Sequence, residues 1–102
     1  MSNAREFEWD DAKASANAVK HRLEFSYAAN VFLDPYRTDV DASRPEDGEM
    51  RRKVIGLVEG RLLTVVYTAR ADVVRIISAR RANTMEIRTW HASHSIRITH
   101  PE

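Results

Sequence analysis

The sequence contains no cysteine, and it has only three glycines and three prolines among 102 residues. Without thiols the chain cannot form disulfides, thiolate metal sites or a cysteine nucleophile, and it fits a reducing compartment. No apolar run approaches the roughly 20 residues that a membrane-spanning helix needs. The charged N-terminus MSNAREFEWDDA also lacks the apolar centre of a signal peptide, so we expect a cytoplasmic protein.

What is present is ordinary for a globular chain: 43% hydrophobic and 30% charged residues in 11.7 kDa. This length supports one modest hydrophobic core. We expect a single domain over residues 5–92, followed by a C-terminal tail, residues 93–102, without a clear pattern. No internal repeat or low-complexity stretch is visible.

The charges are divided unevenly along the chain. Residues 1–49 carry 11 acidic and 6 basic side chains, whereas residues 50–102 carry 4 acidic and 10 basic ones. The basic half is rich in arginine, whose planar guanidinium group suits phosphate. This asymmetry indicates a face for nucleic acid or for an acidic partner. The alternative is that the acidic half covers the basic half within the same molecule.

The N-terminal half predicts helices with one short strand on either side. A helix-spaced apolar pattern begins after Asp10 or Asp11, which can cap it, and a second pattern begins near Ser26. The second pattern ends at Asp34-Pro35 because proline cannot continue a helix. In chain order we expect an edge strand at 6–9, helices over 12–22 and 26–34, and a loop over 35–49 with a short strand near 38–40.

From Met50 onward the period changes to two, which is typical of strands. Glu59-Gly60 predicts a tight turn, and residues 70–72 a second one. Asn83 and Glu86 have the spacing of a capping box at the start of a last helix. We therefore expect strands at 51–58, 61–69 and 73–79. The fold class is α+β, with two N-terminal helices and a C-terminal helix packed on an antiparallel β-meander.

Six separated blocks then carry a family resemblance: FEWDDAKASANAVKH, FSYAANVFLD, GEMRRKVIG, GRLLTVVYTAR, VVRIISARRA and MEIRTW. Together, over nearly all of residues 7–90, they resemble the BrnT toxin family. The resemblance implies a RelE-like fold, a ribonuclease activity that arrests translation, and neutralisation by a BrnA antitoxin. BrnA proteins carry a ribbon-helix-helix module, so operator DNA would be bound only through the antitoxin. We expect either a homodimer or a heterotetramer with that antitoxin.

The sequence departs from the family pattern at three positions. Arg22 follows Lys20-His21 where the family usually has glycine. Met50 replaces a carboxylate in the usual Glu-Glu-Arg-aromatic segment, and Trp90 stands where tyrosine is common. These departures weaken any role assigned to Met50 or Trp90.

RNA cleavage by attack of the 2′-hydroxyl requires a base, an acid and positively charged groups that stabilise the phosphorane. We expect Arg75 and Arg80 to contact phosphate, with Arg51 on the adjacent strand as a third cation. In a regular strand Arg75 and Arg80 would point to opposite faces, unless Arg80 lies beyond the strand end. The alternative is that these arginines are ion-paired within the fold. The candidate partners are Glu49, Asp10 and Asp11.

Other candidate site residues have a competing structural interpretation. His21 is the best general acid or base, although a histidine at a helix end can simply be solvated or favoured by the dipole. Glu49 is a candidate base or an ion-pair partner of Arg51 or Arg52. The candidate RNA-binding residues are Lys20, Arg51, Tyr67 and Arg81, for which plain surface or, for Tyr67, core packing is the alternative.

No cofactor or metal is expected. His91, His94 and His100 lack supporting carboxylates, which makes a metal site a weak interpretation. For Trp9 and Trp90 we favour burial over base stacking. Two functions remain: a metal-independent endoribonuclease toxin, or a non-catalytic partner module that acts as co-repressor with a DNA-binding antitoxin. A DNA-binding protein acting alone is disfavoured, because no helix-turn-helix or zinc pattern occurs.

Overall fold

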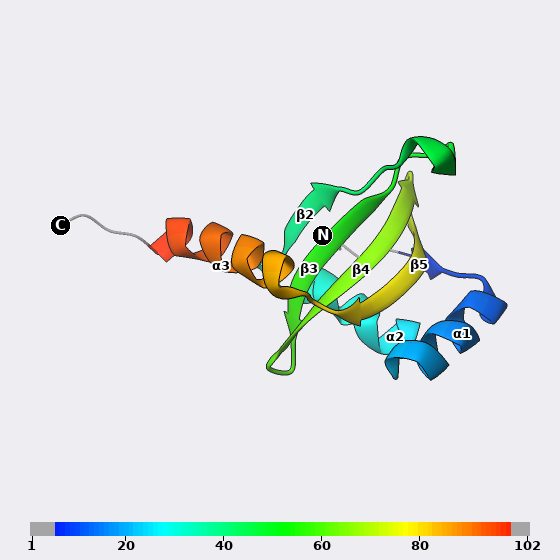
Figure 1. Cartoon of the computed structure of the whole chain (residues 1–102), viewed down its shortest axis with the longest axis horizontal. Helices are drawn as coiled ribbons and strands as arrows, with labels where there is room; N and C mark the ends of the chain where they lie inside the picture. Colours follow the sequence, from blue (N-terminus) through cyan, green and yellow to red (C-terminus); the bar gives the residue numbers. More distant parts are fainter. Residues whose placement is uncertain (1–5, 99–102) are drawn as a thin grey trace.

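The computed structural model describes residues 6–98. Its centre is one five-stranded sheet in the order β1-β5-β4-β3-β2 (Figure 1). The strands are β1 (Glu6–Glu8), β2 (Thr38–Asp41), β3 (Arg52–Val58), β4 (Arg61–Arg70) and β5 (Val73–Arg81). The helices are α1 (Asp11–His21), α2 (Phe25–Ala28) and α3 (Thr84–Ile98), with 3₁₀ turns η1 (Ala29–Leu33) and η2 (Pro45–Asp47). The predicted α+β class is confirmed.

The predicted antiparallel meander is present as β3, β4 and β5, and the sheet has one further strand at each edge. β2, β3, β4 and β5 pair antiparallel in turn, and the Glu59-Gly60 turn between β3 and β4 has both residues at positive φ, 49° and 83°. β1, however, pairs parallel with β5, so the sheet is mixed. A three-residue strand carries no sequence signal for its direction.

The predicted second N-terminal helix is shorter than expected. Only α2 is α-helical, and the chain then tightens into η1 before Pro35. At η1 the chain lies directly on β3. A Cβ atom added to Gly56 would stand 2.8 Å from the Val31 carbonyl oxygen. This close approach fixes the helical layer against the sheet.

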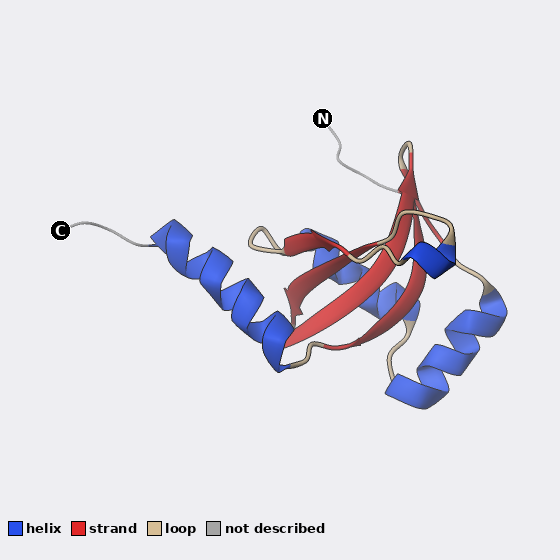
Figure 2. Ribbon diagram, turned by 45° about the horizontal axis from the view of Figure 1, so that its top comes forward, coloured by secondary structure: helices blue, strands red, loops and turns tan. Residues whose placement is uncertain are grey.

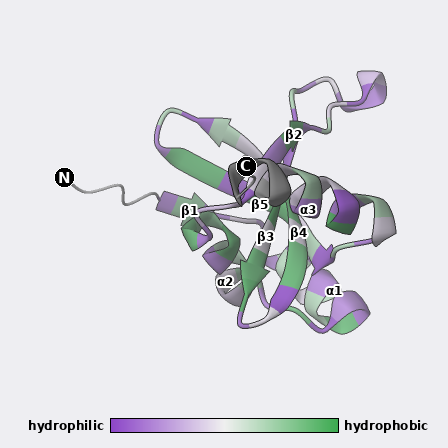
Figure 3. Cartoon of the chain, turned by 90° about the vertical axis from the view of Figure 1, so that its left-hand side faces the viewer, coloured by the Kyte–Doolittle hydropathy of each residue, from purple (hydrophilic) through white to green (hydrophobic). Residues whose placement is uncertain are grey.

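The two faces of the sheet are covered differently. α2 and η1 cover the face that carries Leu63, Val65 and Tyr67, which we call the core face. Side chains alternate along β4, so Thr64, Val66 and Thr68 point to the opposite face, which we call the open face. In Figure 3 the central strands β3 and β4 are largely hydrophobic, as expected for strands of which one side forms the core.

α1 lies beside the outer edge of β5. Its cap is as predicted, because the Lys13 backbone N–H donates to Asp10 Oδ2 at 3.0 Å. Its one buried residue is Asn17, whose side chain donates to the Ala79 carbonyl at 2.9 Å and accepts from the Ala79 N–H at 3.1 Å. The amide therefore replaces the strand partner that β5 lacks at this position.

α3 begins on the open face and then extends away from the sheet (Figure 2). The predicted capping box is present: Glu86 N–H donates to Asn83 Oδ1 at 2.8 Å, and Asn83 N–H donates to Glu86 Oε1 at 2.9 Å. The helix continues to Ile98, so residues 93–98 of the expected tail are helical, while 99–102 lie outside the described part. None of the described helices is both long and apolar enough to cross a bilayer.

Candidate nucleic-acid interface

Arg75 and Arg80 lie on the same face of the sheet. Arg75 is opposite Thr68 and Arg80 is opposite Thr64, and both threonines belong to the open face. The alternation shifts because Ile77 has no partner in the ladder between β4 and β5. One additional residue in a strand is a β-bulge, which moves the following side chains to the other face. The strand is therefore not regular, and the two cations expected to contact phosphate share one surface.

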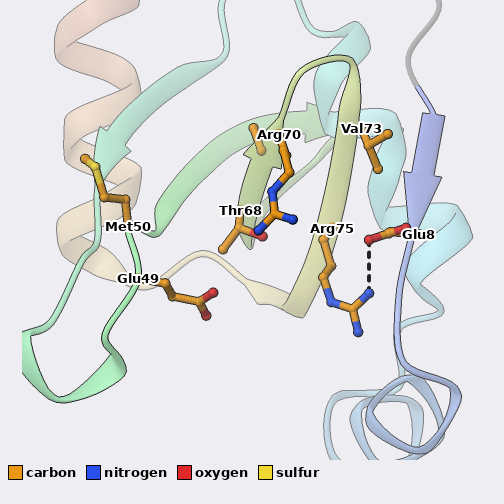
Figure 4. A pocket seen from close by; sticks show the side chains of 8 residues that line it. Glu8, Glu49, Met50, Thr68, Arg70, Val73 and Arg75 are labelled. Atoms are coloured by element: carbon orange, nitrogen blue, oxygen red, sulfur yellow. Dashed lines mark hydrogen bonds and ion pairs between the residues drawn. The ribbon is translucent and has the colours of Figure 1, made fainter.

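Around Arg75 the open face is hollowed, with a volume of about 650 Å³. The side chains that carry polar chemistry come from β1, β4, β5 and the loop before β3, as Figure 4 shows. Arg75 Nη1 donates to Glu8 Oε2 at 3.0 Å, and both side chains are about half exposed. Two carboxylates and two guanidinium groups line this hollow, together with a hydroxyl and a thioether: Glu8, Glu49, Arg70, Arg75, Thr68 and Met50.

Glu49 lies in this hollow, and Arg51 is not among its lining residues. Arg51 Nε donates to Glu49 Oε2 at 3.3 Å and lies 3.5 Å from Asp47 Oδ2. The ion-pair interpretation of Glu49 is thus confirmed, but its carboxylate remains half exposed beside the hollow. Arg51 is mostly covered and already surrounded by carboxylates, so its geometry does not favour the predicted phosphate contact.

Arg80 is paired within the fold, although not by the acids that the sequence suggested. Glu86, only 1% exposed, accepts from Arg80 Nη1 at 2.7 Å and Nη2 at 2.9 Å. Lys53 Nζ and Thr64 Oγ1 donate to the same carboxylate at 2.8 and 2.9 Å. Burial acts to raise the pKa of Glu86, but the hydrogen bonds from Arg80, Lys53, Asn83 and Thr64 outweigh it and hold the pKa well below its usual range.

The structure does not place His21 or Lys20 in the hollow. Both belong to the last turn of α1, at the outer edge of β5, and Lys20 is exposed. His21 is half-buried, and among the described side chains, residues 6–93, its ring has no hydrogen-bond partner. The predicted grouping of His21 with Arg75 is therefore not formed in this structure.

Tyr67 and Arg81 also point away from the hollow. Tyr67 is 5% exposed on the core face, and its hydroxyl donates to Asp39, which also accepts from Arg52 Nε at 2.5 Å. Burial and then the Asp39 carboxylate raise the pKa of Tyr67 to about 12. Core packing, the alternative interpretation, is confirmed for Tyr67. Arg81 is exposed and pairs with Leu63, at the end of the core face.

Burial is also the better description of both tryptophans. Trp90 is 7% exposed, and its indole N–H donates to Asp34 Oδ2 at 3.0 Å. Trp9 is half-buried, with its ring edge against Phe25 at 5.8 Å between centroids. Among the described residues no three His, Asp or Glu side chains are grouped to hold a metal ion, and His100 lies outside that part of the chain.

Sequence reasoning missed Glu8, Thr68 and Arg70 in the hollow and Lys53 beside it. The sequence did carry a signal for Thr68 and Arg70. A two-residue turn at Ala71-Asp72 places Arg70 opposite Val73, and counting back places Thr68 opposite Arg75. For Glu8 no signal existed, because its position depends on the parallel pairing of β1.

Comparison with known proteins assigns the chain to a family. The family model for BrnT, the ribonuclease toxin of type II toxin–antitoxin systems, matches residues 9–86. The chain therefore belongs to the BrnT toxin family, which confirms the resemblance carried by the six sequence blocks. A search of curated proteins finds no match.

Proposed function

We propose that this chain is an endoribonuclease toxin that cleaves RNA on the open face of its sheet, without a metal ion, and so arrests translation. Membership of a family of ribonuclease toxins gives the class of reaction. The observation that carries the location is the hollow lined by Arg75, Arg70 and the half-exposed carboxylate of Glu49 (Figure 4). We take the surrounding RelE-like sheet to be the scaffold of this activity.

In this proposal Arg75 binds the phosphate to be cleaved. A guanidinium group has five N–H donors, and Glu8 accepts from Nη1 alone, so donors remain for a phosphate. Glu49 removes the proton of the 2′-hydroxyl, whose oxygen attacks phosphorus while the bond to the 5′ oxygen breaks. The leaving oxygen takes a proton from water, and the products are a 2′,3′-cyclic phosphate and a 5′-hydroxyl. Arg75 and Arg70 stabilise the additional charge on the phosphorane.

The same proposal includes the expected partner. A BrnA-like ribbon-helix-helix antitoxin would neutralise the toxin and would carry all contacts with operator DNA. Acidic side chains of that antitoxin would cover the cations of the open face and so exclude RNA. A complex in which Arg75 stays open to solvent would argue against this mode of inhibition.

The test is expression of the chain alone in a bacterium, with growth and RNA integrity followed over time. We expect growth arrest with RNA cleavage for the natural sequence. Arg75→Ala and Glu49→Gln should abolish cleavage. Both side chains are about half exposed, so the protein should remain folded without them. Arg88→Ala, an exposed arginine on α3, is the matched control and should retain full activity.

The opposite outcome has a definite meaning. Normal growth with intact RNA would identify the chain as a non-catalytic co-repressor, provided that it binds tightly to the product of the neighbouring gene, where we expect the antitoxin to be encoded. Cleavage by purified protein that persists in both Arg75→Ala and Glu49→Gln would instead refute the assigned site while leaving the ribonuclease activity in place.

A further inference from the structure

Glu86 holds two cations, although its own charge can neutralise only one of them. Its Oε1 accepts from Thr64, Arg80 Nη1 and the Asn83 backbone N–H, and its Oε2 accepts from Lys53 and Arg80 Nη2. All three charged groups are fixed in place by these bonds. A cluster of one carboxylate, one ammonium and one guanidinium group has a net charge of +1.

The cations also have unused donors. Arg80 uses three of its five N–H groups, two on Glu86 and one on the Arg81 carbonyl at 3.3 Å. Lys53 uses one of three, on Glu86. Four N–H groups therefore have no acceptor among residues 6–93, whose side chains the structure describes, and no second carboxylate pairs with either cation there. The Lys53 and Arg80 side chains are 28% and 31% exposed, so part of each side chain faces solvent.

The cluster belongs to the open face, beside the hollow around Arg75. Lys53 is opposite Val66, and Arg80 is opposite Thr64, on the same side of β4 as Thr68. Thr64 and Thr68 are four residues apart, which corresponds to about 13 Å along a strand. A stacked single strand rises about 3.4 Å per nucleotide. A strand whose cleaved phosphate lies at Arg75 would thus reach the cluster roughly four nucleotides away, or fewer if it is extended.

We propose that Lys53 and Arg80 form a second phosphate-binding site for RNA, a few nucleotides from the cleaved bond, and that Glu86 is the positioning residue that orients them. This inference rests on the proposed function and adds a substrate class to it: single strands long enough to span both sites. The net positive charge and the oriented, unused donors suit an anion with several acceptor oxygens. A backbone phosphate is such an anion, and the shared face supplies the path to it.

The experiment measures binding of a non-cleavable 2′-O-methyl octanucleotide to the purified chain over a salt series from about 50 to 200 mM. Each phosphate contact on a single strand contributes about 0.7 to the slope of log affinity against log salt concentration. Lys53→Ala should lower the magnitude of the slope by about 0.7 and weaken binding about threefold to tenfold. A 2′-O-methyl dinucleotide, too short to span both sites, should bind equally well to the natural chain and to Lys53→Ala.

Arg88→Ala is again the matched control. Like Lys53→Ala, it removes one positive charge. Residue 88 belongs to α3, as Glu86 does, but lies on the opposite side of that helix. Its salt slope should equal that of the natural chain. Thermal unfolding of each variant confirms that it is folded before binding is compared, and Lys53→Ala provides the decisive measurement if Arg80→Ala does not fold.

Glu86→Gln separates positioning from simple charge. Its net charge is higher by one, so electrostatics alone would strengthen binding, whereas loss of orientation should weaken it about threefold or more. Tighter binding by a folded Glu86→Gln protein would overturn the positioning role. Lys53→Ala and Arg80→Ala that melt earlier but keep the full slope would overturn the second site, and the cluster would then only anchor α3.

The outcomes also distinguish this inference from the proposed function. If Arg75→Ala lowers the slope and Lys53→Ala does not, the second site is refuted and the hollow stands. If the natural chain binds no oligonucleotide, both are refuted. If Lys53→Ala keeps its slope but loses affinity for the product of the neighbouring gene, the cluster binds an acidic protein, which also overturns the assignment to RNA.

Discussion

Glu86 binds Arg80 through two parallel hydrogen bonds of 2.7 and 2.9 Å. The pair joins the first turn of α3 to the end of β5, and Lys53 extends the connection to β3. The carboxylate is almost fully buried, so it depends on these donors as much as they depend on it. One carboxylate thereby fixes both the C-terminal helix and two cations of the open face, Lys53 and Arg80.

Glu86→Gln should destabilise the fold, because it removes the one counter-charge that two partly covered cations have among the described side chains. Loss of one partner from a fully buried pair costs about 3 to 5 kcal/mol. Lys53 and Arg80 are about 30% exposed, so we expect a smaller loss, about 2 to 3 kcal/mol at pH 7. Chemical denaturation of Glu86→Gln measures this loss of unfolding free energy, with Lys53→Ala measured for comparison. A loss below about 0.5 kcal/mol for Glu86→Gln would contradict the assigned role.

The same carboxylate gives the stability a defined pH dependence. The folded-state pKa of Glu86 lies below the ordinary value of 4.5, so the folded form releases this proton more readily than the unfolded form. Its contribution is therefore fully present above about pH 5 and is lost as the pH falls below that value. Denaturation at pH 7 and at pH 3.5 should show a smaller acid-induced loss for Glu86→Gln than for the natural chain. An equal loss in both proteins would refute this assignment.

Tyr67 should make the fold sensitive to alkali. Its pKa is raised to about 12 in the folded protein, so stability from the protonated hydroxyl is present below pH 10 and is lost as the pH rises from about 10 to 12. Tyr67→Phe keeps the ring against Phe32 but removes the bond to Asp39. It should cost about 1 to 2 kcal/mol at pH 7. Its stability should fall less steeply between pH 10 and 12, as measured by denaturation; a slope equal to that of the natural chain would contradict the prediction.

Gly56 tests the contact between η1 and the sheet. An alanine Cβ there would lie 2.8 Å from the Val31 carbonyl oxygen and 2.9 Å from the Val31 Cβ, so the backbone must move. Gly56→Ala should cost about 1 to 3 kcal/mol, the range for overpacked cores. Gly48→Ala is the comparison, because a Cβ at Gly48 meets nothing within 4 Å and its cost comes from its φ of 66° alone. A cost for Gly56→Ala below about 0.5 kcal/mol would show that crowding at Gly56 is unimportant.

Local signals in the sequence predicted the local structure. The caps at Asp10 and Asn83 and the turn at Glu59-Gly60 each depend on residues within a few positions of one another, and all three are present. The meander followed from a period of two in a chain with short turns. Such features can be read from sequence because the interacting groups are neighbours in it.

The candidate site could be predicted less well, because it depends on contacts between distant residues. Arg75 was identified, but its neighbour Glu8 is brought to it only by the parallel pairing of β1. The bulge at Ile77 decides that Arg80 shares its face, and no residue type marks that position. Glu86 was predicted as a cap, and the cap is present, yet its larger role depends on Lys53 and Thr64 from two other strands. For His21, the residue type alone said nothing about its position in the fold.

Arg22 offers a last prediction, because it occupies a position that favours glycine. It follows α1 with φ 57°, in the left-handed region, and its N–H donates to the Ala18 carbonyl at 2.9 Å. Glycine adopts this conformation without the steric cost that a side chain carries there. Arg22→Gly should therefore stabilise the fold by about 0.5 to 1 kcal/mol, after the greater flexibility of glycine in the unfolded chain is subtracted. That corresponds to a rise in Tm of roughly 3 to 8 °C, measured by thermal unfolding. Arg22→Ala is the control, since it removes the same charge but keeps Cβ, and it should bring no gain. A gain of equal size in Arg22→Ala would attribute the effect to the charge, and an unchanged Tm in Arg22→Gly would mean that the left-handed turn costs the arginine nothing.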